Sequence, residues 1–319
     1  MTTLIDVARR AGVSKSTVSN VVRGAIPVAK ATRAKVERAI ADIQYHPNAI
    51  ARSLKARTST AIGIVVPDLT NPFYAELAAG AERAATAFGY AALITHTECS
   101  APTEEEAGRA FIERRVDGVI VGGISLGSSL PGLLLDRDIP VVVASFGEPD
   151  DPRLGVIDHD DPTAMEAVVA HLTDLGHRRL AFVSHHLAEQ SGERRRVGFE
   201  SALARRGLKP VGLNEGATAV AAHNDMVAIA TIDQLERRGL RVPEDVSVVG
   251  YDDIPLAEFA SPPLTTLRID PVTQGREAVD MLLAQINGEN YARLEVPYDT
   301  CFVIRESCGF GLNRKIVTE

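Results

Sequence analysis

In the stretch Leu4–Gly24, which reads LIDVARRAGVSKSTVSNVVRG, a glycine at position 12 is followed by hydroxyl, amide and basic side chains. Apolar residues recur at helical spacing on both sides of Gly12, and this glycine suits a sharp turn with positive φ. Ser14 can cap the second helix, and an amphipathic helix at Thr32–Gln44 would cover both. The spacing is that of a DNA-binding helix-turn-helix, with a generic three-helix corner as the alternative.

Charge is distributed unevenly along the chain. Residues 1–58 carry eleven Lys and Arg against three acidic residues, whereas the remaining residues carry 23 basic and 39 acidic side chains. A basic head on an acidic body is expected when only the head meets a polyanion, because phosphate neutralisation dominates affinity for nucleic acid. The charge distribution therefore favours the DNA-binding interpretation of the first helices.

A second pattern that could do chemistry is Gly123-Ile124-Ser125-Leu126-Gly127, which matches the G-x-S-x-G turn of serine hydrolases. That turn must lead directly into a helix, whereas Ser128, Ser129, Pro131 and Gly132 follow here. A serine hydrolase using Ser125 is therefore only a minor alternative. The histidines and cysteines lack metal-ligand spacing and the glycines form no dinucleotide-binding loop, so we expect no metal, no cofactor and no enzyme activity.

Length and composition are those of an ordinary globular protein with two or three domains, since 45% of 319 residues are hydrophobic and 24% charged. No apolar run is long enough to span a bilayer, and the start MTTLIDVARR has no signal-peptide core. The three cysteines form no Cys-x-x-Cys pair. These features predict a cytoplasmic protein without a membrane partner.

From Ala61 onward, apolar strands alternate with helical patterns. A first series has strands at 61–67, 90–95, 117–122 and 139–145. A second series begins near Val156, with strands at 179–184, 217–222 and 246–253, a helix at 271–287 and an extended tail. The alternation predicts parallel sheets with helices on both faces, and two series predict two lobes with a ligand cleft between them. Before Ala61, Pro47 ends the third helix, and a short helix at 49–55 is interpreted as a hinge.

Taken together, these segments resemble the lactose-repressor (LacI) family of bacterial transcription regulators. The resemblance is carried by the stretch Leu4–Gly24 and by five later segments: YHPNAIARSLKAR, GIVVPDLTNPFYAEL, LGHRRLAFVSH, HNDMVAIA and PEDVSVVGYDDIPLAEFASPPLTTLR. It implies an all-α helix-turn-helix head at 1–45, a hinge helix and linker at 46–60, and an α/β two-lobed core of the periplasmic-binding-protein type at 61–319.

The function implied by this resemblance is sequence-specific transcription regulation. The family binds near-palindromic double-stranded DNA as a homodimer, and a small-molecule effector, such as a sugar or related metabolite, binds between the lobes. A repressor is expected, with an activator of the same architecture as the alternative. No heptad pattern follows Glu306, so we expect a dimer and not a tetramer.

In this family the second helix lies in the major groove and the hinge enters the minor groove. The matching positions are Lys15, Ser16 and Asn20 at base edges, with Thr17 and Arg23 nearer the phosphates. Lysine suits guanine acceptors, and asparagine can bond two edge atoms of adenine. In the hinge, the resemblance implies DNA contacts from Asn48, Leu54 and Lys55, with Leu54 as an apolar wedge that kinks the duplex.

The resemblance also implies an effector site in the body. The matching residues are Phe73, Tyr74, Asp160, Arg195, Asn224 and Asp252. Aromatic faces with acidic, amide and guanidinium groups suit a sugar, and the same set would suit a nucleobase or an acid bound by Arg195. Asp158 and Asp161 remain alternatives to Asp160, Phe73 could be plain core, and Asp252 could cap a helix beginning at Pro255.

Two positions depart from the family pattern. Ala29 stands where the family has a Ser or Thr that caps the third helix, a loss of about 1 kcal/mol. Only GLKPVGLNEG at 207–216 joins the helix ending near Arg206 to the strand before Asn224, where the family has an additional strand and helix. We therefore expect the second lobe to lack this unit, which exposes a new sheet edge and removes one wall of the cleft.

Overall fold

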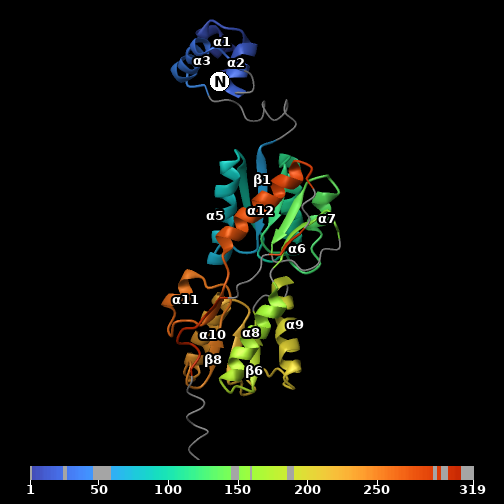
Figure 1. Ribbon diagram of the computed structural model, residues 1–319, viewed down its shortest axis with the longest axis vertical. Coiled ribbons are helices and arrows are strands. Elements are labelled where there is room, and N and C mark those ends of the chain that lie inside the picture. Colours follow the sequence, from blue (N-terminus) through green and yellow to red (C-terminus); the bar gives the residue numbers. More distant parts are fainter. Residues whose placement is uncertain are drawn as a thin grey trace, which may run out of the picture. The chain divides into compact units, whose positions relative to one another are not determined.

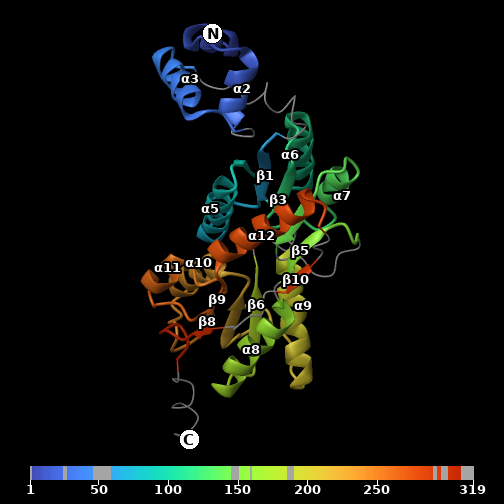
Figure 2. The same ribbon diagram turned by 45° about the horizontal axis from the view of Figure 1, so that its top comes forward.

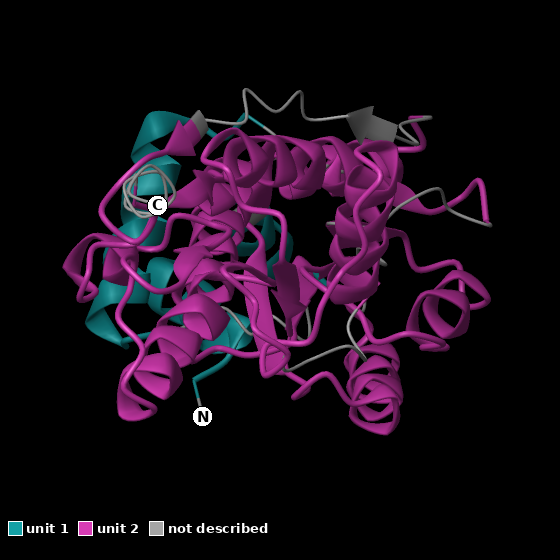
Figure 3. Ribbon diagram, turned by 90° about the horizontal axis from the view of Figure 1, so that it is seen from below, with its two compact units in different colours: residues 1–59 teal, residues 60–319 magenta. Residues whose placement is uncertain are grey.

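The computed structural model describes residues 2–23, 27–45, 59–144, 151–158, 160–184, 190–289, 293–295 and 301–309. The chain forms two compact units, residues 1–59 and residues 60–319 (Figure 3). The predicted hinge helix, with Asn48, Leu54 and Lys55, lies outside the described residues, as does the side chain of Arg23.

The described residues of unit 1 form a three-helix bundle, which confirms the predicted all-α head. Its helices are α1 (Leu4–Ala11), α2 (Lys15–Arg23) and α3 (Lys30–Asp42). Thr3 and Asp6 cap α1 reciprocally, and Gly12 ends it with a φ of 66°, the left-handed conformation that glycine adopts without strain. Val7, Val18 and Val36, one from each helix, are completely buried and join them in one small core.

The first lobe of unit 2 is a parallel sheet with strands in the order β10-β5-β4-β3-β1-β2. These are β1 (Ala61–Val66), β2 (Ala91–His96), β3 (Gly118–Val121), β4 (Val141–Ala144), β5 (Gly155–Asp158) and β10 (Arg293–Glu295). Helices α5 (Pro72–Ala87) and α12 (Pro271–Ile286) cover one face, and α6 (Ala101–Arg114) and α7 (Leu130–Leu135) cover the other (Figure 1). Because strand side chains alternate, Ile64 packs beneath α5 and α12 while its neighbour Val65 packs beneath α6 and α7.

The second lobe is built on a smaller parallel sheet in the order β6-β7-β8. Its strands are β6 (Leu180–Val183), β7 (Ala219–Ala222) and β8 (Ser247–Val249), and β9 (Thr266–Arg268) pairs antiparallel with β11 (Cys301–Val303). Its helices are α8 (Asp161–Asp174), α9 (Gln190–Arg205), α10 (Asp225–Arg237) and α11 (Pro255–Phe259). Helices α8 and α9 pack on one face of the sheet and α10 on the other (Figure 2). Both lobes confirm the predicted α/β core.

The division of elements between the lobes differs from the sequence prediction. We predicted that the segments after Val156 belong to one second series, but β5, α12 and β10 join the first lobe. The chain passes between the lobes after β5, after β9 and after β10. The apolar residues Ala278, Val279 and Leu282 of α12 pack in the core of the first sheet, which decides where this helix lies.

The interval 206–218, all of it described, contains turns and neither a helix nor a strand. Its Val211 N–H donates to the Leu180 carbonyl at 3.0 Å on the open edge of β6. Val211 and Leu213 also pack against the apolar cluster beneath α10. The short loop thus covers part of the edge and of the face that would otherwise be exposed to water.

Candidate functional sites

The first turn of α2 carries an ordered set of polar groups. Ser14 precedes the helix, and its Oγ accepts the Thr17 N–H at 3.1 Å, as predicted for a cap. Lys15 and Ser16 are exposed. Ser16 and Asn20 are four residues apart and therefore share one helix face. This face presents ammonium, hydroxyl and amide groups, which are the groups that read base edges in the major groove.

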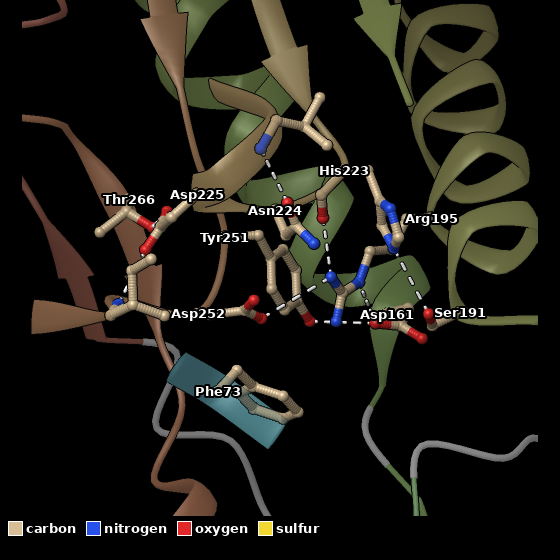
Figure 4. Close-up of polar contacts among 12 residues, drawn as sticks. Phe73, Asp161, Ser191, Arg195, His223, Asn224, Asp225, Tyr251, Asp252 and Thr266 are labelled. Atoms are coloured by element: carbon tan, nitrogen blue, oxygen red, sulfur yellow. Dashed lines mark hydrogen bonds and ion pairs between the residues drawn. The ribbon is translucent and has the colours of Figure 1, made fainter. Parts of the chain in front are cut away.

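Arg195 forms the centre of a buried polar cluster in the second lobe (Figure 4). Its side chain comes from α9 and is only 4% exposed. Nε donates to Asp161 Oδ1 at 3.1 Å, and Nη1 donates to the His223 carbonyl at 2.7 Å. The guanidinium lies 3.6 Å over the ring of Tyr251, whose hydroxyl donates to Asp161 at 3.0 Å. One arginine thus joins α8, the start of α10 and the end of β8.

The electrostatics of this cluster keep the arginine charged and the tyrosine neutral. Burial alone would lower the pKa of Arg195, but Asp161, Tyr251 and Asp252 outweigh it and raise that pKa. Burial, and then the Asp161 charge, raise the pKa of Tyr251 well above its ordinary value. Arg195 is therefore charged and paired with Asp161 inside the protein.

Two of the residues predicted for the effector site lie differently in the structure, with Asp160 outside the buried cluster and Asp252 within it. Asp160 is exposed, and its carboxylate caps α8 by accepting the Thr163 N–H at 3.1 Å. The next residue, Asp161, is the one that meets Arg195. Asp252 does not cap α11, which starts after Ile254 without a side-chain cap, and it lies 3.7 Å from Arg195 instead. A one-residue choice between adjacent aspartates depends on helix rotation, which the spacing alone did not determine.

Tyr251 and His223 also belong to the cluster around Arg195, and the sequence did not predict either of them as part of the site. Tyr251 follows an apolar strand and reads as core, whereas His223 contributes a backbone carbonyl, for which sequence carries no signal. Two residues after His223, Asp225 accepts the Thr266 hydroxyl at 2.6 Å and the Ile254 N–H at 2.8 Å. Burial raises the pKa of Asp225 to about 7 against these two hydrogen bonds. These contacts hold the start of α10 against β9 and α11.

A cavity of about 510 Å³ lies where the two lobes of unit 2 meet. The starts of α5 and α10 both border it, capped by Asn71, which accepts the Phe73 N–H, and by Asn224, which accepts the Val227 N–H. Of the predicted effector residues, Tyr74 and Asn224 line the cavity. Phe73 is buried in edge-to-face contact with Tyr74, so it is a core residue that supports the wall. The lining residues are Pro67, Asp68, Thr70, Asn71, Tyr74, His96, Glu98, Cys99, Asn224, Met226 and Val227.

Comparison with known proteins agrees with this architecture. Residues 3–48 match the model for bacterial regulatory proteins of the lacI family. Residues 59–217 match the periplasmic binding proteins and sugar binding domain of the LacI family, and residues 169–308 match a periplasmic binding protein-like domain. The HTH-type transcriptional repressor PurR of Photobacterium profundum is 34% identical over 330 residues, covering 96% of this chain and 98% of the relative. The chain belongs to the LacI family of bacterial regulatory proteins.

Other relatives support the same assignment of this LacI-family regulator. The PurR repressor of Vibrio cholerae is 34% identical over 316 residues, covering 92% of this chain and 94% of the relative. The lac repressor dimer bound to operator and the anti-inducer ONPF superposes with a TM-score of 0.86 at 28% identity, covering 96% of this chain and 98% of that one. The CelR–cellobiose complex superposes with a TM-score of 0.69 at 29% identity, covering 96% and 100%.

The serine hydrolase alternative at Ser125 is wrong for this LacI-family chain, whose relatives are transcriptional repressors. The Ser125 hydroxyl donates to Glu104 at 2.6 Å, its N–H donates to the same carboxylate at 3.0 Å, and both residues are buried. No helix follows it until Leu130, so the serine is not held at a helix start.

No group of three or more His, Cys, Asp or Glu side chains among the described residues could hold a metal ion. None of the helices in that part of the chain has the length and hydropathy to span a membrane.

The Ala29 departure from the LacI-family pattern is visible at α3. This helix begins after Ala29 without a side-chain hydrogen bond to its first turn. The Thr32 and Arg33 N–H groups donate to the Ala29 carbonyl, and no side chain of residue 29 adds a cap, which is consistent with the loss of about 1 kcal/mol expected for a missing cap.

Proposed function

We propose that this regulator is a repressor that binds a near-palindromic operator as a homodimer. Its affinity for the operator rises or falls when a small effector binds in the cavity between its lobes. The basic helix-turn-helix unit is the observation that carries the DNA-binding part, together with relatives named as repressors. Two paired heads are needed because one recognition helix reads only a few base pairs.

On the DNA side, α2 enters the major groove in this proposal. Lys15, Ser16 and Asn20 read base edges, and Thr17 and Arg23 contact phosphates, which position the protein without conveying sequence. The hinge residues Asn48, Leu54 and Lys55 complete the interface in the minor groove. Leu54 acts as a wedge between base steps, where the cost of unstacking is offset by contacts that the bent duplex permits.

Operator binding tests this side of the proposal. Genome-wide mapping of bound DNA identifies the operator, and affinity for it should fall by roughly 10³-fold or more between 50 and 200 mM salt. Leu54→Ala should abolish tight binding to the operator while leaving weak binding to unrelated DNA. The exposed Leu126 of the body provides a control, because Leu126→Ala should bind as wild type. Wild-type affinity in the Leu54→Ala protein would refute the wedge.

On the effector side, the cavity favours a neutral, hydroxyl-rich compound such as a sugar or a related metabolite. Its wall offers the amide of Asn224, the ring of Tyr74 and the starts of two helices, a mixture suited to hydroxyl groups. A carboxylate effector would have to take Arg195 from its buried partner Asp161, which is costly for both groups. The same compound touches both lobes, so it stabilises one lobe arrangement over another.

A ligand panel tests the effector class. Thermal unfolding and operator affinity are measured with sugars, nucleosides and carboxylic acids, and we expect a hydroxyl-rich compound to change both. Asn224→Ala should weaken its effect, whereas Asn214→Ala should not, because Asn214 lies in the 206–218 loop and bonds Arg238. A response confined to carboxylic acids would contradict the assignment of Arg195 as internally paired.

The homodimer has a candidate interface on the second lobe. Helix α11 exposes Leu256 and Phe259, which are three residues apart on the helix, and Phe259 is 79% exposed. Adjacent exposed apolar side chains of this size mark protein interfaces, and the proposed partner is a second copy.

Phe259→Asp is expected to shift the protein toward monomer because it places a charge in this interface, and operator affinity should fall with it. Sedimentation velocity and operator titration measure the two effects. Val197→Asp on α9 is the matched control, because Val197 is 47% exposed on another face. A Phe259→Asp protein that sediments as wild type would place the interface elsewhere.

A further inference from the structure

Three polar contacts meet at one oxygen at the start of the recognition helix. Ser14 Oγ lies 3.1 Å from the Thr17 backbone nitrogen, 2.7 Å from Ser16 Oγ and 2.8 Å from Thr17 Oγ1. All three distances are those of hydrogen bonds. The inference below rests on the proposed DNA-binding role of this helix.

The hydrogen-bonding capacity of Ser14 couples the two neighbouring hydroxyls. A serine oxygen carries one proton and two lone pairs. One lone pair accepts the Thr17 N–H, so the remaining proton and lone pair serve Ser16 and Thr17. One of these two hydroxyls must donate to Ser14 and the other must accept from it. The hydroxyl that donates inward presents only lone pairs to DNA, and the other keeps a free proton.

The position of each hydroxyl on the helix indicates which one keeps its proton. Ser16 is exposed and shares the groove-facing side with Asn20, whereas Thr17 is half-buried beside the core residue Val18. The outer face of a helix in the major groove meets base edges, and its flanks meet the phosphates. Phosphate oxygens only accept hydrogen bonds, so the flanking Thr17 must donate outward.

We propose that Ser14 is a positioning residue for sequence recognition, which holds Ser16 as a hydrogen-bond acceptor. Thr17 donates to a phosphate and accepts the Ser14 proton, and Ser16 donates to Ser14. Ser16 then offers lone pairs to the groove and selects a base with an amino group on its major-groove edge. Adenine N6 and cytosine N4 are such groups, whereas guanine and thymine present acceptors at the corresponding positions.

Selection from a random double-stranded DNA library by the full-length protein tests this proposal. Ser16→Ala identifies the base position that Ser16 reads, as the one whose preference it removes. Each base pair presents one amino and one keto group in the major groove, so the preference is read on the strand that faces Ser16. On that strand the wild type should favour adenine or cytosine by about three- to tenfold, the range of a single hydrogen bond. Ser14→Ala should reduce this preference below about twofold, because Ser16 is then free to donate as well as to accept.

Ser14→Asp separates hydroxyl orientation from helix capping. Aspartate also caps helices, and its carboxylate only accepts, so both hydroxyls would donate inward. The adenine or cytosine preference should persist, while affinity falls for all sequences because Thr17 loses its free proton and a negative charge approaches the phosphates. The Ser14→Asp protein therefore keeps the test valid if Ser14→Ala fails to fold.

Several results would overturn the proposal. A wild-type preference for guanine or thymine on the strand that faces Ser16 would mean that Ser16 donates, and an unchanged preference in Ser14→Ala would mean that Ser14 does not orient it. A Ser16→Ala protein with the wild-type motif would exclude Ser16 from base reading. If the wild-type protein enriches no motif at all, the DNA-binding function itself fails, which is distinguishable from these outcomes.

Discussion

Replacing Arg195 with alanine is expected to lower the free energy of unfolding of the 60–319 unit by up to about 3–5 kcal/mol, because the buried carboxylate of Asp161 loses its closest guanidinium. It keeps the more distant Arg194, at 3.6 Å, and the Tyr251 hydroxyl. Asp161 is completely buried, and Tyr251 would also lose the cation that covers its ring. Urea unfolding followed by circular dichroism measures the loss. The same substitution should weaken any effector response, because Arg195 connects α9 to the start of α10 at the cavity.

The neighbouring arginine provides a matched control for this prediction. Arg196 is on the same helix but pairs with Glu193 and Glu200 at the partly exposed surface. Arg196→Ala should therefore cost no more than about 1 kcal/mol, as exposed ion pairs do. Equal destabilisation by the two substitutions would show that the buried cluster contributes no more than a surface pair.

Gly275→Ala is the second substitution for which we expect a large effect, a loss of about 1–3 kcal/mol or more in the stability of the first lobe. Helices α5 and α12 cross closely, and a Cβ atom at Gly275 would lie 2.7 Å from the Ala81 backbone nitrogen and closer still to the Leu77 carbonyl oxygen. Both are backbone atoms, so no side-chain rotation relieves the clash. On the opposing helix, Gly80 meets the backbone of Val272 in the same way.

A glycine with free space around it serves as the control. Gly132 is an exposed residue of α7 with no atom near the position of an added Cβ. Gly132→Ala should be neutral or stabilise by about 0.4–1 kcal/mol, because alanine restricts the unfolded chain. Thermal unfolding of both variants tests the pair. A Gly275→Ala protein with wild-type stability would mean that α5 and α12 separate easily, contrary to their close packing.

The helix-turn-helix unit could be predicted from sequence almost completely, because its determinants are local. Gly12, the Ser14 cap and the valines at helical spacing act within a few residues of one another. The alternation of strands and helices after Ala61 likewise predicted parallel sheets, since strand period and helix period are properties of short segments. The shortened 207–216 interval was also visible in the chain itself.

Long-range packing decided the rest. The pattern of α12 shows an apolar face but not which sheet covers it, and only the fold places that face on the first lobe. Asp160 and Asp161 are equivalent in sequence, yet the rotation of α8 makes one a surface cap and the other the partner of Arg195. Tyr251 and the carbonyl of His223 join Arg195 from segments distant in the chain. Local spacing therefore determined the DNA-reading end, whereas the polar cluster beside the cavity depends on contacts that only the tertiary structure brings together.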